Sequence, residues 1–120
     1  MSDSDTTIEE LKRSVADFSA EREWEPFHTL KNLAMSIAIE SGELMEHFQW
    51  VEGEAVEASL EDSDRRKAVE AELADVVIYA LQFADRGEID LASAVRRKMR
   101  INAEKYPVER SRGSSRKYDA

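Results

Sequence analysis

The segment Leu33-Ala-Met-Ser-Ile-Ala-Ile-Glu-Ser-Gly-Glu43 closes an apolar run with two carboxylates that are three residues apart. The segment Glu72-Leu-Ala-Asp-Val-Val-Ile-Tyr-Ala-Leu81 has the reverse order, because its acidic pair precedes the apolar run. On a helix, side chains three residues apart lie on one face with their Cβ atoms about 5–6 Å apart. Carboxylates rarely enter the buried stripe of a helix unless their charge is compensated. Two such pairs facing each other would offer the oxygen ligands that a hard divalent cation prefers, which predicts a metal site.

The alternative interpretation of the four acidic residues is that they are ordinary solvent-exposed helix positions. The chain contains 26 Asp and Glu residues, so some acidic pairs at this spacing arise by chance. The small and apolar neighbours of Glu40, Glu43, Glu72 and Asp75 favour the metal site, and Gly42 leaves room for a close approach. Di-iron bundles are the rival class, but their pairs include histidine, which is absent from both pairs here. All-oxygen ligation favours Mg²⁺ or Mn²⁺ over redox iron.

Helical periodicity extends along the chain, which contains only four glycines and two prolines. Thr7 followed by Glu10 predicts a capping box that opens a first helix. That helix ends before Pro26, because proline disfavours helical geometry at the residue that precedes it. Further helices are predicted over residues 29–51, 64–85 and 91–106, with Asp90 capping the last of them and a polar connection over 52–64. The prediction is an all-α, four-helix-bundle-like single domain over residues 1–120, in which 1–5 and 108–120 are flexible or tail segments.

Charge is distributed unevenly along the sequence. The formal net charge is −9, yet residues 96–120 hold nine Lys and Arg against three acids, whereas the first 95 residues hold eight basic and 23 acidic residues. The acidic body argues against duplex DNA or RNA as a main partner, because phosphate neutralisation dominates such affinity. The basic end could contact the phosphates of a small anionic ligand or dock on the acidic body, and the sequence leaves both open.

Cysteine is absent, which excludes a disulfide framework and thiolate-ligated zinc. No apolar run approaches the roughly 20 residues that a membrane-spanning helix requires, and the N-terminus lacks the character of a signal peptide. We therefore expect a cytoplasmic protein without a membrane partner.

Several aromatic and polar residues have two interpretations each. Lys98, Asn102 and Tyr106 recur every four residues and form either a solvated helix face or, beside a metal-bound polyphosphate, a set of phosphate contacts. Tyr79 lies one helical turn after Asp75.

Trp24 and Trp50 flank the second predicted helix, with His28 near the first of them. These three side chains are either core residues or a platform on which a flat base stacks. Glycine-rich phosphate-binding loops are absent, so a triphosphate would have to be held by metal rather than by backbone amides.

Several segments together form a recognisable pattern: Phe18-x-x-Glu21-Arg22-x-Trp24-x-x-Phe27-His28, Glu40-Ser-Gly-Glu43-Leu44, Phe48-Gln49-Trp50, Glu72-Leu-x-Asp75-Val76-x-Ile78-Tyr79, Lys98-Met99-x-x-Asn102 and Tyr106-Pro-Val-x-x-Ser111-Arg112-Gly113-Ser114-x-x-Lys117-Tyr118. With these segments the chain resembles the MazG-like superfamily of all-α nucleoside triphosphate pyrophosphohydrolases, and within it the dCTP pyrophosphatase branch. The resemblance is collinear over nearly the whole sequence, and its tryptophans and C-terminal motif are more specific than the acidic pairs. One departure is Ile39, where the broader pattern has glutamate, but the dCTP-type branch also lacks a glutamate there.

The resemblance implies Mg²⁺-dependent hydrolysis of a deoxynucleoside triphosphate, dCTP or a modified dCTP, to the monophosphate and pyrophosphate as nucleotide-pool house-cleaning, with Mn²⁺ as a substitute metal. It also implies a homotetramer built as a dimer of dimers, with sites near subunit contacts and a tail that helps to close them. The residues that it assigns are metal ligands (Glu40, Glu43, Glu72 and Asp75), contacts to phosphate or sugar (Lys98, Asn102 and Tyr106, with Tyr79 close by) and a base pocket (Trp24, His28 and Trp50).

The mechanistic hypothesis is attack by water at the α-phosphorus, with Glu40 or Glu43 orienting or deprotonating that water. The sequence does not choose between the two glutamates. Two other functions remain open: a broad-specificity MazG-like or dUTP-type pyrophosphohydrolase, and a non-catalytic, metal-binding oligomeric bundle.

Overall fold

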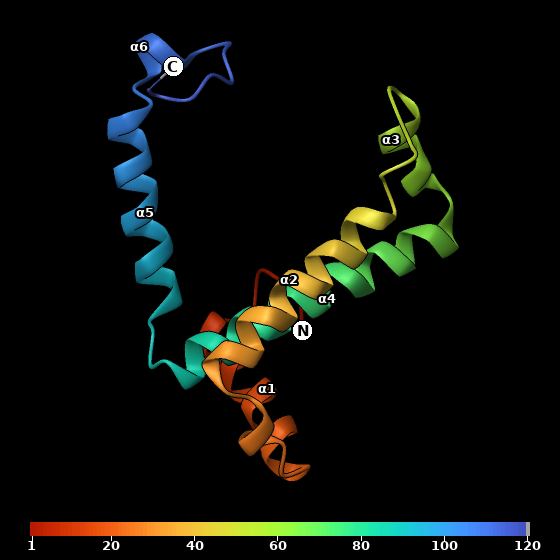
Figure 1. Ribbon diagram of the computed structural model, residues 1–120, viewed down its shortest axis with the longest axis vertical. Coiled ribbons are helices and arrows are strands. Elements are labelled where there is room, and N and C mark those ends of the chain that lie inside the picture. Colours follow the sequence, from red (N-terminus) through yellow and green to blue (C-terminus); the bar gives the residue numbers. More distant parts are fainter. Residues whose placement is uncertain (120) are drawn as a thin grey trace. The chain divides into compact units, whose positions relative to one another are not determined.

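The computed structural model describes residues 1–119, and all the regular secondary structure in that range is helical, without a β-strand (Figure 1). It confirms the prediction of an all-α fold. The chain divides into two compact units, Met1–Glu88 and Ile89–Ala120, and each is described here by itself. The first unit contains α1 (Ile8–Glu21), η1 (Glu25–Phe27), α2 (Leu30–Glu46), α3 (Ala55–Ala58), η2 (Ser59–Glu61) and α4 (Ser63–Arg86), and the second contains α5 (Leu91–Lys105) and α6 (Val108–Ser111).

The four long helices all begin at a side-chain N-cap. In each case the oxygen of a Thr or Asp accepts a hydrogen bond from the backbone N–H three residues later, which satisfies one of the free donors of the first turn. Thr7 caps α1 over a distance of 3.1 Å and Thr29 caps α2 over 3.2 Å. Asp62 and Asp90 cap α4 and α5, each over 2.9 Å. The predicted starts at Thr7 and Asp90 are therefore confirmed.

The segment after α2 differs from the prediction. The helix ends at Glu46 rather than near Val51, because the N–H of Phe48 bonds to the carbonyl of Met45, a tighter three-residue turn. Gly53 then takes φ +61°, a conformation that favours glycine. The expectation of an irregular connection over residues 52–64 was wrong for residues 55–61, which form α3 and η2.

The predicted tail is also partly ordered. Residues 108–111 form α6, a single helical turn that follows Pro107. Ala120, the last residue of the predicted tail, lies outside the described residues. The single-domain assignment over residues 1–120 stays a prediction.

The core of the first unit lies where α2 runs antiparallel along α4, and α1 packs against the C-terminal half of α4 (Figure 1). Leu33 of α2 is 1% exposed, and Leu81 and Ala84 of α4 are equally inaccessible. Ser19 of α1 is buried as well, and its Oγ accepts a hydrogen bond of 2.8 Å from Nε2 of Gln82. This bond fixes α1 on α4 near the residues that line the candidate site.

Apolar side chains also cover the outer faces of α2 and α4. Met35 and Ile39, one turn apart on α2, are 53% and 59% exposed, and Leu73 and Val77, one turn apart on α4, are 51% and 43% exposed. Stripes of large apolar residues of this kind mark interaction surfaces more often than free surface. Among residues 1–119, no helix has both the length and the apolar character that crossing a lipid bilayer would require.

Candidate metal centre

Three of the four predicted carboxylates meet between α2 and α4. Glu40 and Glu43 project from α2 and Glu72 from α4, and one oxygen of each lies within 4.8 Å of the others. The antiparallel packing that buries Leu33 and Leu81 brings these acidic faces together, because each glutamate follows the helical register of its apolar neighbours. Asp75 lies one turn after Glu72, and its charge acts on the carboxyl groups of both Glu40 and Glu72.

Crowding of negative charge changes the acidity of this cluster. The pKa of Glu40 is raised to about 7, mainly by a hydrogen bond with Glu43, then by desolvation and by the charges of Glu43 and Asp75. Desolvation is the main cause that raises the pKa of Glu72, followed by its hydrogen bond with Glu43. Like charges held this close disfavour the ionised form of each group. A cation among them would remove that penalty.

The cluster also holds acceptors without donors. Oε2 of Glu40 and Oε2 of Glu72 are shielded from solvent, and neither has a hydrogen-bond partner within the described part of the chain. Buried polar atoms are nearly always satisfied, so orphaned carboxylate oxygens in an acidic cluster suit a missing cation. An all-oxygen donor set of carboxylates fits a hard divalent ion.

Without metal, the thermal stability of the protein should fall as the pH rises from the usual carboxyl value of 4.5 through about 7. The folded state binds the Glu40 proton more tightly than the unfolded state does, so stability is highest below that window and is lost as Glu40 ionises. Melting temperatures in EDTA across this range test the expectation. A Glu40→Gln variant cannot ionise at this position and should lose less stability; an identical pH dependence in the two proteins would show that Glu40 does not carry the effect.

A largely apolar cavity of about 350 Å³ lies beside the carboxylates in the first unit. Its lining includes Trp24, His28 and Tyr79, three of the residues singled out in the sequence, together with Asp75. The ring centroids of Trp24 and His28 are 6.1 Å apart at an interplanar angle of 68°. Asp75 borders this cavity and its charge also acts on the carboxylate cluster, so this residue adjoins both features.

Trp50 is not part of this lining. It follows the C-terminal end of α2 and its side chain is 86% exposed, so within one chain it is neither a core residue nor a wall of the cavity. Lys98, Asn102 and Tyr106 belong to the second unit, on α5 and at its C-cap. Their contact with substrate phosphates therefore stays a prediction.

Five other lining residues escaped the sequence analysis as site residues. Ile78 and Gln82 come three and seven residues after Asp75, so the helical spacing that selected Tyr79 contained the signal for them too. The others belong to α1. The five residues are Ser14, Val15, Phe18, Ile78 and Gln82.

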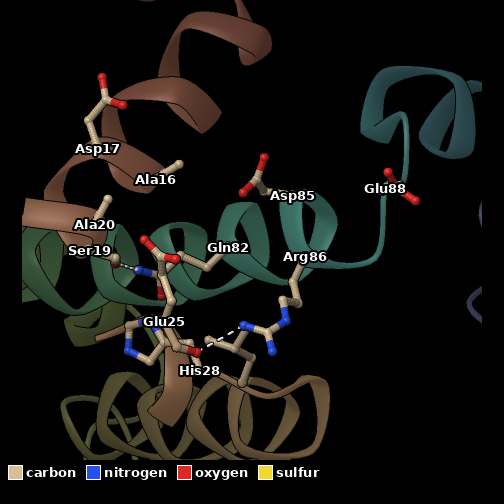
Figure 2. Close-up of a pocket in the computed structure, with 11 residues that line it drawn as sticks. Ala16, Asp17, Ser19, Ala20, Glu25, His28, Gln82, Asp85, Arg86 and Glu88 are labelled. Carbon is tan, nitrogen blue, oxygen red and sulfur yellow. Dashed lines mark hydrogen bonds between the residues drawn. The ribbon is translucent and has the colours of Figure 1, made fainter. Parts of the chain in front are cut away.

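A second cavity of about 480 Å³ adjoins Ser19 and Gln82 and is much more polar (Figure 2). Carboxylates from α1, η1 and α4 line it, and Nη1 of Arg86 donates a hydrogen bond of 2.9 Å to the carbonyl oxygen of Glu25. Its lining contains no Trp, Tyr or Phe side chain. It therefore suits a flat base less well than the smaller aromatic cavity does.

Comparison with known proteins gives consistent matches. A model of the MazG-like family matches residues 35–120. dCTP pyrophosphatase 1 of Bos taurus is 43% identical over 115 residues, covering 96% of this chain and 68% of that protein. The Homo sapiens protein of the same name is 44% identical over 113 residues, covering 93% and 66%, so the chain spans about two thirds of the length of these relatives. A solved pyrophosphatase structure from Archaeoglobus fulgidus is 46% identical with a TM-score of 0.76, covering 83% of this chain and 92% of that one.

Proposed function

The chain belongs to the MazG-like family, and we propose that it is an Mg²⁺-dependent pyrophosphohydrolase that converts dCTP or a modified dCTP to the monophosphate and pyrophosphate. The observation that carries the proposal is the position of Asp75, which borders the aromatic cavity and also acts on the carboxylate cluster. A nucleotide whose base occupied the cavity would extend its phosphates toward the carboxylates. Curated relatives named dCTP pyrophosphatase 1 support the choice of substrate.

The carboxylates of Glu40, Glu43, Glu72 and Asp75 are the groups that would hold the metal, and Mn²⁺ would use the same donors. When bound, Mg²⁺ supplies neutralisation of phosphate charge and acidification of the attacking water. Without a cation, the four carboxylates would repel a triphosphate as well as one another. The orphaned oxygens of Glu40 and Glu72 support this assignment.

Hydrolysis requires a water molecule to attack the α-phosphorus while the bridging bond to the β-phosphate breaks. The attacking oxygen forms the new P–O bond, its proton passes to a carboxylate, and pyrophosphate leaves with the bonding electron pair. Glu40 and Glu43 are the candidate acceptors, since both project from α2 into the carboxylate cluster. Either could take the proton through a carboxylate oxygen that does not hold the metal.

The position of attack is tested by hydrolysis in ¹⁸O-labelled water followed by mass spectrometry of both products. Attack at the α-phosphorus places the label in the nucleoside monophosphate and leaves pyrophosphate unlabelled. Label in the pyrophosphate would contradict the mechanism while leaving the metal centre in place. A parallel reaction of the enzyme in ordinary water, which gives unlabelled products, serves as the control.

Base binding depends on aromatic stacking, so Trp24→Ala should raise KM for dCTP by about 5- to 100-fold, the range expected for a stacked base. Trp50→Ala should also raise KM if Trp50 completes the pocket, as the family resemblance implies. Phe27→Ala removes another exposed aromatic side chain that does not line the cavity and is the matched control. Steady-state kinetics decide the matter: an unchanged KM in Trp24→Ala would contradict the pocket, and an unchanged KM in Trp50→Ala would remove that residue from it.

We further propose that the domain works as a homotetramer, a dimer of dimers, in which the four-helix arrangement is completed. The exposed apolar stripes of α2 and α4 support this, because they flank the carboxylates and contiguous exposed apolar groups often mark subunit contacts. Val95 and Met99 form a third stripe on α5, where they are 48% and 64% exposed. Subunit contacts would cover these residues.

A further inference from the structure

The end of the second unit is a closed loop rather than an extended tail. Gly113 takes φ +76°, a left-handed conformation that favours glycine and reverses the chain. Beyond it, the backbone N–H of Ser114 bonds to the carbonyl of Ser111 over 3.1 Å. The rings of Tyr106 and Tyr118 meet edge to face with centroids 5.9 Å apart and an interplanar angle of 86°, which joins the two ends of the loop.

This loop encloses a cavity of about 390 Å³ whose lining is strongly basic. Four cations contribute to it, Lys105, Arg110, Arg116 and Lys117, and no carboxylate of residues 1–119 does. Within residues 1–119, the basic residues that form ion pairs with carboxylates are Arg13, Arg22 and Arg66. None of the four cations of the cavity is among them. Like charges gathered around one cavity repel each other and create a positive potential inside it.

The remaining polar groups of the lining are also hydrogen-bond donors. Tyr106, Tyr118, Ser111 and Ser114 bring hydroxyl groups, and the Lys and Arg side chains can only donate. Nζ of Lys105 lies 5.0 Å from the centroid of the Tyr118 ring, so this cation is held at the wall of the cavity. A ligand that matches must be compact, strongly anionic and rich in acceptor oxygens. Phosphate groups meet all three conditions, and arginine recognises them through paired hydrogen bonds.

We propose that this cavity is a binding site for a pyrophosphate group, either inorganic pyrophosphate or the terminal phosphates of a nucleotide. The loop holds two successive phosphates among its four cations, and the tyrosine pair keeps the cations in place. The site is formed by residues 105–118 alone, so it needs neither the carboxylate cluster nor the proposed hydrolysis.

The test is calorimetric titration of the full chain with inorganic pyrophosphate in EDTA, which removes any metal-dependent binding. Wild type should bind one pyrophosphate per chain. Replacing Arg116 and Lys117 together by glutamine should weaken that binding by at least about tenfold, since each charged hydrogen bond contributes about 1.5–3 kcal/mol. The Arg97→Gln/Arg100→Gln double variant, with the same change of charge on α5 outside the cavity lining, should stay within about twofold of wild type.

A loss of affinity that is equal in the two double variants would overturn the proposal, because it would reflect the overall charge of the unit. No loss in Arg116→Gln/Lys117→Gln would overturn it as well. Tyr118→Ala keeps every cation but removes the edge-to-face contact, and it too should weaken binding; circular dichroism checks that the helices remain. Unchanged binding in Tyr118→Ala would contradict the role given to the loop.

The same titrations with dCTP and dCMP distinguish the two sources of the ligand. If the cavity binds the terminal phosphates of the nucleotide, the Arg116→Gln/Lys117→Gln change weakens the binding of dCTP by a similar factor and leaves the binding of dCMP unaffected. If the cavity binds the released product, only the binding of inorganic pyrophosphate is weakened. A Glu72→Gln variant separates this proposal from the proposed function, because it should lose hydrolysis and keep pyrophosphate binding in EDTA.

Discussion

The Glu72→Gln variant is expected to lose more than about 100-fold in kcat/KM for dCTP. Glutamine keeps the size of the side chain but removes its charge from a cluster in which oxygens of three glutamates lie within 4.8 Å. Changes to residues that merely support metal ligands already cost about 10- to 100-fold, so loss of a ligand should cost more. Steady-state kinetics with saturating Mg²⁺, together with calorimetric titration of Mn²⁺, measure both consequences of the change.

Glu70→Gln is the matched control for this variant. Glu70 lies on the same helix, two residues away, and forms an exposed ion pair of 3.1 Å with Arg66. Exposed ion pairs contribute at most about 1 kcal/mol, so activity should stay within about twofold of wild type. Circular dichroism should show the same helix content in both variants. Appreciable turnover in Glu72→Gln would remove Glu72 from the metal site.

Replacing Leu73 by glutamate should convert the proposed tetramer into single chains. Leu73 is 51% exposed and forms an apolar stripe with Val77 on α4. A carboxylate buried in a subunit contact without a partner destabilises that contact by several kcal/mol. Multi-angle light scattering should therefore give the mass of four chains for wild type and of one chain for Leu73→Glu.

Ala71→Glu introduces the same charge at another exposed position of α4, two residues away. It should keep the wild-type mass. Hydrolysis should fall with the mass in Leu73→Glu, because the sites are proposed to lie near subunit contacts. A wild-type protein that is monomeric, or a Leu73→Glu variant that keeps its mass, would contradict the proposed tetramer.

Much of the helical framework could be predicted from local sequence. Caps at Thr7 and Asp90 follow from the chemistry of free backbone donors, and these predictions are confirmed to the residue. The spacing of Glu40, Glu43 and Glu72 within apolar runs predicted that they share facing surfaces, and the antiparallel packing of α2 and α4 brings their oxygens together. Membership of the MazG-like family, inferred from the same motifs, is confirmed over residues 35–120.

Other features depended on interactions that the pattern does not contain. The early end of α2 and the short helices after it each depend on a single turn of the chain. Over so few residues, the sequence does not distinguish a helical from a non-helical turn. The aromatic cavity needed the contact between α1 and α4, so Ser14, Val15 and Phe18 could not be assigned from one helix alone. Trp50 is a further case, since its exposed side chain has no place in the cavity of its own chain.

The most direct test of the proposed activity is pyrophosphate release from a panel of deoxynucleoside and nucleoside triphosphates, measured with Mg²⁺ and again with EDTA. We predict release that requires Mg²⁺ and is fastest with dCTP or a modified dCTP. Equal release from all bases would keep the metal centre and favour a broad-specificity enzyme, and preference for dUTP would favour the dUTP-type activity. Absence of release from every triphosphate in the presence of Mg²⁺ would contradict the account and leave a non-catalytic metal-binding bundle.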